Sequence, residues 1–228
     1  MESTCEIIEL YGLPGCGKTT LCEAFKRKFS EGEVADINDI FQKIRTLSRS
    51  RRLLLIPLSV VIPLLCLWFT CPILSYRQRG IYRAFLKRIA VISYIKKTNQ
   101  YRYAILDHGI VQCAHSLYLG REQYFTKKAE KKFLSVLKCF SPIKYVYCSV
   151  PVDTAIERIT IRKALNHGRL DSIDNLDTLK RILQEQEIFF TNVFAALSCA
   201  LEDANLRVEM RDNSVEVAMT LTRSLKSK

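Results

Sequence analysis

The sequence lacks the patterns that mark several common classes of protein. Its nine cysteines include no C-x-x-C pair, and none of its three histidines stands at a metal-ligand spacing, so no zinc site is expected. The cysteines are then small, mostly apolar residues of a chain in a reducing compartment. No basic segment followed by an apolar one opens the sequence, which argues against a secretory signal and favours a cytoplasmic location. No internal repeat or low-complexity linker divides the 228 residues, so a single domain is expected over 1–228.

Acidic residues are missing from one long interval. Between Asp39 and Asp107 the chain has no Asp or Glu, yet this interval holds thirteen of the 35 basic residues. The rest of the chain is nearly neutral, so the net charge of +12 belongs to a basic insertion at 40–102. Its basic residues flank an apolar block and do not form a stripe interleaved with exposed aromatics. Nucleic acid is therefore not expected as a partner.

One glycine-rich stretch organises the rest of the sequence. It fits G-x-x-x-x-G-K-[ST] and comprises Gly12, Leu13, Pro14, Gly15, Cys16, Gly17, Lys18 and Thr19, followed by Thr20. An apolar stretch of strand type precedes it at 5–11, and an amphipathic helix pattern follows at 20–29. Glycines let backbone N–H groups wrap a phosphate chain, the helix start adds a positive dipole, and Lys18 can reach the terminal phosphates. The pattern predicts nucleotide binding, with the Thr19 hydroxyl available to Mg²⁺.

Cys16 differs from the other cysteines because it lies in this loop at a helix start, where a thiolate is favoured. The alternative is that the position only needs a small residue.

Strands and helices alternate along the chain. Further strands are expected at 33–39, 103–109, 143–150 and 206–210, with helices at 112–139, 153–166, 175–202 and 214–226. We expect Asp153 to cap the helix that it begins. Alternation of this kind requires parallel crossovers, so the predicted fold is a three-layer α/β/α sandwich with an apolar helical insertion between its second and third strands.

Asp107 lies at the carboxyl end of the predicted strand 103–109. A carboxylate there faces the crevice in which ligands bind, and it can hold Mg²⁺ directly or through water. The alternative is a solvent-exposed aspartate with no ligand. His108 follows it instead of a glutamate, and no N-K-x-D guanine motif occurs. Both absences favour phosphoryl transfer to an acceptor over regulated hydrolysis.

Basic side chains follow the next predicted strand. Arg158 and Arg162 share one helix face, and Arg169 comes shortly after. Arginines stabilise the charge that spreads over the transferred phosphoryl group. An ordinary surface helix would also carry them.

In this order the motifs resemble those of the P-loop nucleoside and nucleotide kinases, most closely the thymidylate-kinase-like and deoxynucleoside-kinase-like members. The resemblance covers about 1–39 and 103–228. It implies a five-stranded parallel sheet of order 2-3-1-4-5, ATP held by residues 12–20, Mg²⁺ organised by Thr19 and Asp107, and an arginine lid at 152–172. By the same resemblance Arg158, Arg162 and Arg169 are lid arginines, and Asp212 and Asn213 fall at the adenine side. The family's acid–arginine pair after the third strand is replaced by Asp107-His108, so the acceptor stays open.

The insertion contains 23 consecutive uncharged residues at 53–75, with arginines on both flanks. Its length suits a membrane span, but the strands before and after it are expected to be sheet neighbours, which rules against a single crossing. Two arrangements remain open. One is a hairpin that contacts an anionic membrane through 49–79, and the other is a helical roof over the acceptor or a homodimer face.

These observations lead to one main hypothesis and two alternatives. The main hypothesis is an ATP- and Mg²⁺-dependent kinase acting on a small-molecule acceptor, either nucleoside- or nucleotide-like or a partly apolar hydroxyl compound. A hydroxyl acceptor would need a base, for which Asp36 or Asp39 is the candidate, although a strand-end aspartate can equally cap the next helix. The alternatives are a membrane-associated nucleotide switch and a kinase relic that binds nucleotide without turnover.

Overall fold

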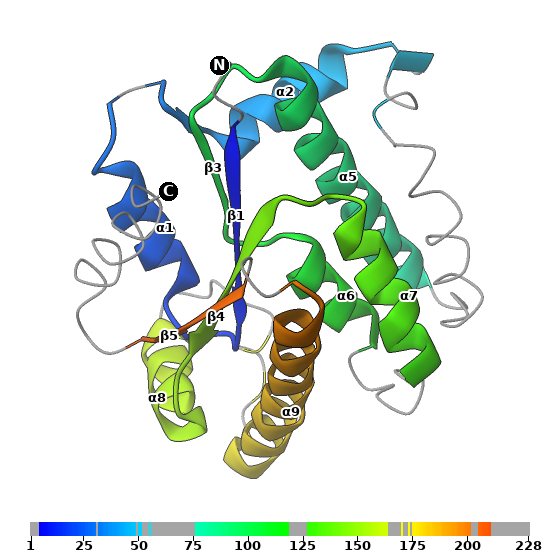
Figure 1. Ribbon diagram of the computed structural model, residues 1–228. Coiled ribbons are helices and arrows are strands. Elements are labelled where there is room, and N and C mark those ends of the chain that lie inside the picture. The colour runs from blue at the N-terminus through cyan, green and yellow to red at the C-terminus, as the bar shows by residue number, and fades with distance from the viewer. Residues whose placement is uncertain are drawn as a thin grey trace.

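A computed structural model gives the structure of residues 5–30, 32–48, 50–51, 55, 76–118, 127–163, 170, 173, 175–201 and 205–210. Strands and helices alternate through these ranges (Figure 1). The strands are β1 (Glu6–Gly12), β2 (Val34–Ala35), β3 (Tyr103–Leu106), β4 (Ile143–Ser149) and β5 (Asn205–Glu209). The helices are α1 (Lys18–Lys26), α2 (Ile37–Thr46), α5 (Tyr76–Thr98), α6 (Ile110–Tyr118), α7 (Lys127–Lys138), α8 (Val152–Lys163) and α9 (Leu176–Ala200).

The strands form one parallel sheet in the order β2-β3-β1-β4-β5. In Figure 1, α1 and α8 cover the left side of this sheet, and α5, α6, α7 and α9 lie to its right. The predicted sandwich and the predicted strand order are both confirmed. This topology places the carboxyl ends of β1 and β3 side by side, which is where ligands bind in parallel sheets.

The central strand β1 is buried on both faces, which explains its nearly continuous apolar sequence. On one face the Tyr11 ring stacks on Tyr147 of β4 at 5.4 Å between centroids and contacts Phe190 of α9 at 6.0 Å. Phe25 of α1 meets the edge of Tyr103 of the neighbouring strand β3 at 6.0 Å. Aromatic packing of Tyr11 therefore helps to fix the strand that leads into the glycine loop.

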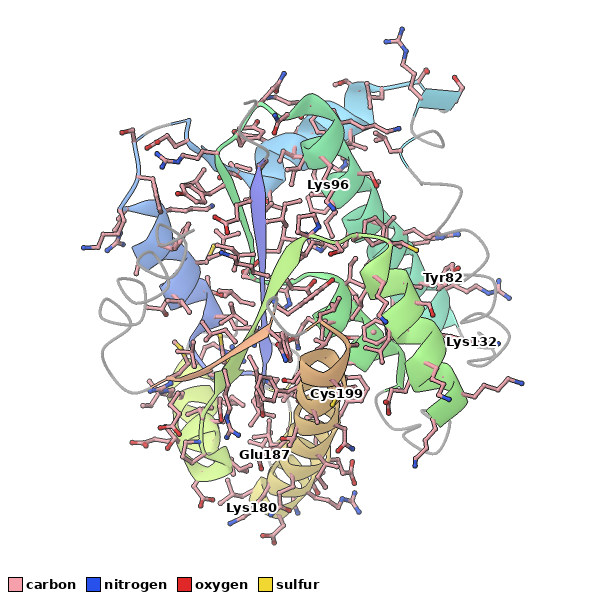
Figure 2. The ribbon with its side chains drawn as sticks, viewed as in Figure 1. Tyr82, Lys96, Lys132, Lys180, Glu187 and Cys199 are labelled. Carbon is pink, nitrogen blue, oxygen red and sulfur yellow. The ribbon has the colours of Figure 1, made fainter. Side chains whose placement is uncertain are left out.

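Helix α5 was not predicted, and it attaches the end of the basic insertion to the domain. It packs against α6 and α2. Near its end, the Lys96 ammonium donates hydrogen bonds to the carbonyls of Phe140 and Ser141, the latter at 3.0 Å (Figure 2). These bonds tie the helix to the turn that precedes β4. Apart from Leu55, the apolar block 53–75 lies outside the described residues, so the roof, dimer and hairpin arrangements stay predictions.

Several predicted boundaries are wrong. The strand expected at 33–39 is only Val34–Ala35, because the Asp36 carboxylate accepts the N–H groups of Asn38 and Asp39 and starts α2 there. Asp153 lies inside the first turn of α8. The helix expected at 112–139 begins earlier, at Ile110, and its described parts are α6 and α7. The helix expected at 214–226 lies outside the described residues. No helix within the described ranges has the length and apolar character that crossing a bilayer requires.

Candidate nucleotide and metal site

The glycine loop joins β1 to α1 through a tight turn. The Cys16 N–H donates to the Leu13 carbonyl at 3.2 Å, with Pro14 and Gly15 between them. Gly15 has φ 81°, so this is a turn of type II, which takes proline at its second position and glycine at its third. A Cβ at Gly15 would also come within 2.9 Å of the Ala155 carbonyl of α8. The loop therefore packs closely against α8, and the Pro14-Gly15 pair of the motif makes both the turn and this close approach possible.

The start of α1 is open to an anion. Gly17 is its N-cap residue, and among the described residues no side chain caps this helix and no acid stands in its first turn. The first N–H groups of a helix have no partner within the helix, and its dipole end is positive. Thr19 and Thr20 are exposed here. The loop thus presents unpaired donors of the kind that bind phosphate.

Lys18 closes the loop from inside. Its side chain is buried, and the ammonium donates to the carbonyls of Gly12 at 2.9 Å and Leu13 at 2.8 Å. It also lies 3.4 Å from the Cys16 sulfur. These partners all belong to the loop, so the ammonium is held within it.

Thr19 and Asp107 meet at the carboxyl edge of the sheet. The Thr19 hydroxyl donates to Asp107 Oδ2 at 3.5 Å. The contact follows from the register, because Glu9 of β1 pairs with Leu106 of β3, the residue before Asp107. A hydroxyl and a carboxylate are hard oxygen ligands, and Mg²⁺ binds through one or two such groups while it keeps phosphate and water oxygens. Within the described ranges no three His, Cys, Asp or Glu side chains form a metal cluster.

Helix α8 carries an arginine to the loop. The Arg158 Nη1 atom lies 3.9 Å from the position that a Cβ on Gly17 would occupy. Arg162 follows one turn later and is half-buried. Of the predicted lid arginines, Arg158 is thus placed at the loop, whereas Arg169 lies outside the described residues, as do Asp212 and Asn213.

Asp36 stands apart from this group as the N-cap of α2. Its Oδ1 accepts the Asn38 N–H at 2.7 Å, and its Oδ2 lies 3.5 Å from the Lys26 ammonium. Partial burial works to raise the pKa of Asp36, but these backbone and ammonium partners outweigh it and lower the pKa. The carboxylate is therefore charged at neutral pH, and the cap is one of the two roles that the sequence left open.

Helix α6 supports the loop through residues that the sequence analysis did not single out. The Gln112 side-chain oxygen accepts the Gly12 N–H at 3.3 Å. Glu9, buried in β1, accepts the Val111 N–H at the start of the same helix. The signal available for Glu9 was a lone acid inside an apolar strand, whereas nothing in the local sequence marked Gln112.

His115 of α6 is also buried near the loop. Its ring lies 4.7 Å from Phe190 and 5.1 Å from Phe189 between centroids. Burial, with a smaller contribution from the Lys18 charge, lowers the pKa of His115 to about 3. The imidazole is therefore neutral at physiological pH and packs as part of the core.

The strand order, the glycine loop and the strand-end aspartate define the P-loop kinase fold. Neither protein-family models nor curated protein sequences give a match. Solved structures that align include shikimate kinase from Acinetobacter baumannii in complex with shikimate, at 17% identity and a TM-score of 0.49, over 99% of this chain and 95% of that chain. Deoxyadenosine kinase from M. mycoides with bound dCTP aligns at 13% identity and a TM-score of 0.46, over 96% of this chain and 99% of that chain. The same enzyme with bound dATP aligns at 12% identity and a TM-score of 0.46. Likenesses this weak carry no conclusion about activity.

Proposed function

We propose that the protein is an ATP- and Mg²⁺-dependent kinase that transfers the γ-phosphoryl group to a small-molecule acceptor. The observation that supports this most directly is the hydrogen bond from the Thr19 hydroxyl to Asp107 Oδ2, at the residue that follows the buried Lys18. It joins two magnesium-type oxygen ligands from separate parts of the chain, next in sequence to a lysine of the type that binds phosphate. Hydrolysis by a water-activating acid is less well supported, because His108 follows Asp107.

Each residue has a role in this proposal that its position allows. The loop N–H groups and the α1 dipole bind the phosphate chain, and Lys18 leaves the loop carbonyls to hold its terminal oxygens. Thr19 and Asp107 would hold Mg²⁺, which would supply positive charge to the phosphates. Arg158, with Arg162 and Arg169, offsets charge on the phosphoryl oxygens during transfer. Gly12–Thr20 and Asn213 are the proposed ATP contacts.

The acceptor is proposed at the level of chemical class. We infer a compound with a hydroxyl or phosphate oxygen and a partly apolar body, because the insertion between β2 and β3 combines arginines with an apolar block. With a hydroxyl acceptor, Asp36 or Asp39 is the proposed base. A phosphate acceptor needs no base.

Variants of Lys18 and Asp107 test the proposal. We expect Lys18→Ala and Asp107→Ala each to lower phosphoryl transfer about 100-fold or more, because each removes charge stabilisation at the reacting phosphate. ATP consumption should be measured with nucleosides, nucleotides, sugars and lipid-like alcohols as acceptors. Lys28→Ala and Asp177→Asn, at exposed positions on the surface, are the matched controls. Circular dichroism checks that the fold persists, and ATP consumption that is unchanged in both site variants would refute the kinase.

A second function is supported by one feature of the sequence. The uncharged block 53–75, bracketed by arginines, suits a membrane-associated switch in which nucleotide binding exposes or hides an apolar segment. Such a protein would bind ATP at the same loop without phosphorylating a small molecule.

A further inference from the structure

Two cysteines meet beneath the glycine loop. Cys148 lies on β4, where it pairs with Gly12, and Cys16 lies four residues after Gly12 in the loop. The Cys16 sulfur is 3.4 Å from the position that a Cβ on Gly12 would take, and the register partners Gly12 and Cys148 direct their side-chain positions to the same face of the sheet. Both side chains are fully buried. Strand register therefore holds together two sulfurs that are far apart in the sequence.

The two sulfurs differ in their surroundings. The Lys18 ammonium lies 3.4 Å from the Cys16 sulfur and favours its thiolate. The neighbouring Cys148 thiol lowers the pKa of Cys16, with further help from Lys18, against the opposing effect of burial. The nearby Cys16 and burial raise the pKa of Cys148, whose S–H donates to the Val146 carbonyl at 3.9 Å. Cys16 is thus the nucleophile of the pair, and Cys148 keeps its proton.

We propose that Cys16 and Cys148 form a modification site at which a small peroxide converts the two thiols to a disulfide, and that this disulfide blocks nucleotide binding at the loop. The blocking effect rests on the proposed function, whereas formation of the disulfide does not.

The chemistry balances with hydrogen peroxide as the oxidant. The Cys16 thiolate attacks one peroxide oxygen, the O–O bond breaks, and the hydroxide that leaves takes up a proton to give water. Cys16 is then a sulfenic acid. The Cys148 sulfur attacks the Cys16 sulfur, the S–S bond forms, and the sulfenic oxygen leaves as a second water with the Cys148 proton. Overall the thiols lose two electrons and two protons, and the peroxide is reduced.

A disulfide would change the loop because it draws Cys16 toward β4. A covalent S–S bond is about 2 Å long, much shorter than any hydrogen bond between thiols. Cys16 also closes the turn to Leu13, whose carbonyl holds Lys18. Moving Cys16 toward β4 would distort the turn and take its sulfur away from the Lys18 ammonium. Displacements of about 1 Å in such sites can lower activity strongly.

Burial decides which oxidants act. Neither sulfur is exposed, so the reaction requires a local opening of the loop, through which small hydrogen peroxide is expected to pass more readily than glutathione disulfide. Nucleotide should slow the reaction, because the phosphates draw Lys18 away from Cys16.

The test compares the wild type with Cys148→Ala and with the double variant Cys139→Ser/Cys199→Ser. Cys139 and Cys199 are exposed, and Cys199 lies at the end of α9 (Figure 2), so this variant controls for oxidation elsewhere. Each protein is treated with hydrogen peroxide and digested without reduction, and linked peptides are identified by mass. Binding of a fluorescent ATP analogue with Mg²⁺ is measured before treatment, after it, and after dithiothreitol.

In the wild type and the double variant we expect a linked Cys16–Cys148 peptide and binding at least about tenfold weaker, restored by the reductant. Cys148→Ala should bind the analogue before treatment, give no linked peptide, and show no loss that reductant restores. Absence of the linked peptide in the wild type would overturn the modification site, and a linked peptide with unchanged binding would overturn the block. If the reduced wild type fails to bind the analogue, the proposed function and the block both fail, while the mass measurement still decides the disulfide.

Discussion

At the scale of single residues, Glu9 is the most unusual group in the described structure. Its side chain is fully buried in the central strand, with Oε1 accepting the Val111 N–H and Oε2 lacking a partner among the described residues. Burial raises the pKa of Glu9 from 4.5 to about 7, although the N–H groups at the start of α6 act in the opposite direction. The Glu9 carboxyl group packs directly against Gly109, where a Cβ would lie 2.1 Å from the carboxyl carbon.

This raised pKa predicts an unusual dependence of stability on pH. Between pH 4.5 and 7 the folded protein keeps a proton on Glu9 that the unfolded chain releases. The contribution of Glu9 is therefore most favourable at acid pH and is lost as the pH rises through about 7, by about 3 kcal/mol in total. Urea unfolding between pH 5 and 8.5 measures it.

Glu9→Gln is the matched variant, since it keeps the shape and an acceptor for Val111. We expect its unfolding free energy to fall less over this pH range than that of the wild type. Equal slopes in the two proteins would contradict a buried, protonated Glu9.

At the scale of elements, Asp36 decides where β2 ends and α2 begins. Asparagine caps helices about as well as aspartate, whereas alanine at an N-cap costs about 1 kcal/mol. We therefore expect Asp36→Ala to lower the free energy of unfolding by about that amount and Asp36→Asn to leave it nearly unchanged. Loss of the exposed Lys26 pair should matter little.

The same pair of variants separates the cap from the proposed base. If Asp36 accepts a proton from the acceptor, Asp36→Asn lowers kcat about 100-fold at unchanged stability. An unchanged kcat would assign Asp36 to capping alone.

Elements with a strong local signal were predictable from the sequence. β1, β3 and β4 are buried on both faces, so their apolar runs identified them, and the glycine motif located the loop between β1 and α1. The second strand was predicted too long. It ends at Ala35 because Asp36 caps α2, and this cap depends on the backbone N–H groups of the residues that follow. α5 was not predicted as a separate helix, because it begins directly after the uncharged block 53–75 and the residues at the boundary, Ser75 and Tyr76, are neither glycine nor proline.

Within the site, residues that belong to local motifs could be predicted from the sequence, whereas residues brought in by tertiary contacts could not. The sequence pointed to Lys18, Thr19 and Asp107, and the structure brings these residues together. Cys148 and Gln112 reach the loop only through strand register and the packing of α6. No local pattern could have placed them there.

At the scale of the whole molecule, the uneven charge separates the kinase from the membrane switch. The net charge of +12 attracts anionic surfaces, but such attraction is screened within about 8 Å at physiological salt. We expect flotation with anionic vesicles to show binding that disappears as salt is raised and does not change with ATP.

Neutral vesicles provide the control, because they test apolar insertion without charge. Salt-resistant flotation that depends on ATP would favour the switch over the kinase.

Helix α6 connects helix α5 of the basic insertion with the glycine loop. This helix packs on α5 at the end of the basic insertion, receives the Glu9 carboxylate at its start, and offers Gln112 to the first glycine of the loop. We therefore expect a displacement of α5 to move α6 and with it the Gln112 side chain that accepts the Gly12 N–H. A molecule that binds at α5 should then change the affinity of the glycine loop for nucleotide. By reciprocity, nucleotide at the loop should change the affinity for that molecule by the same factor.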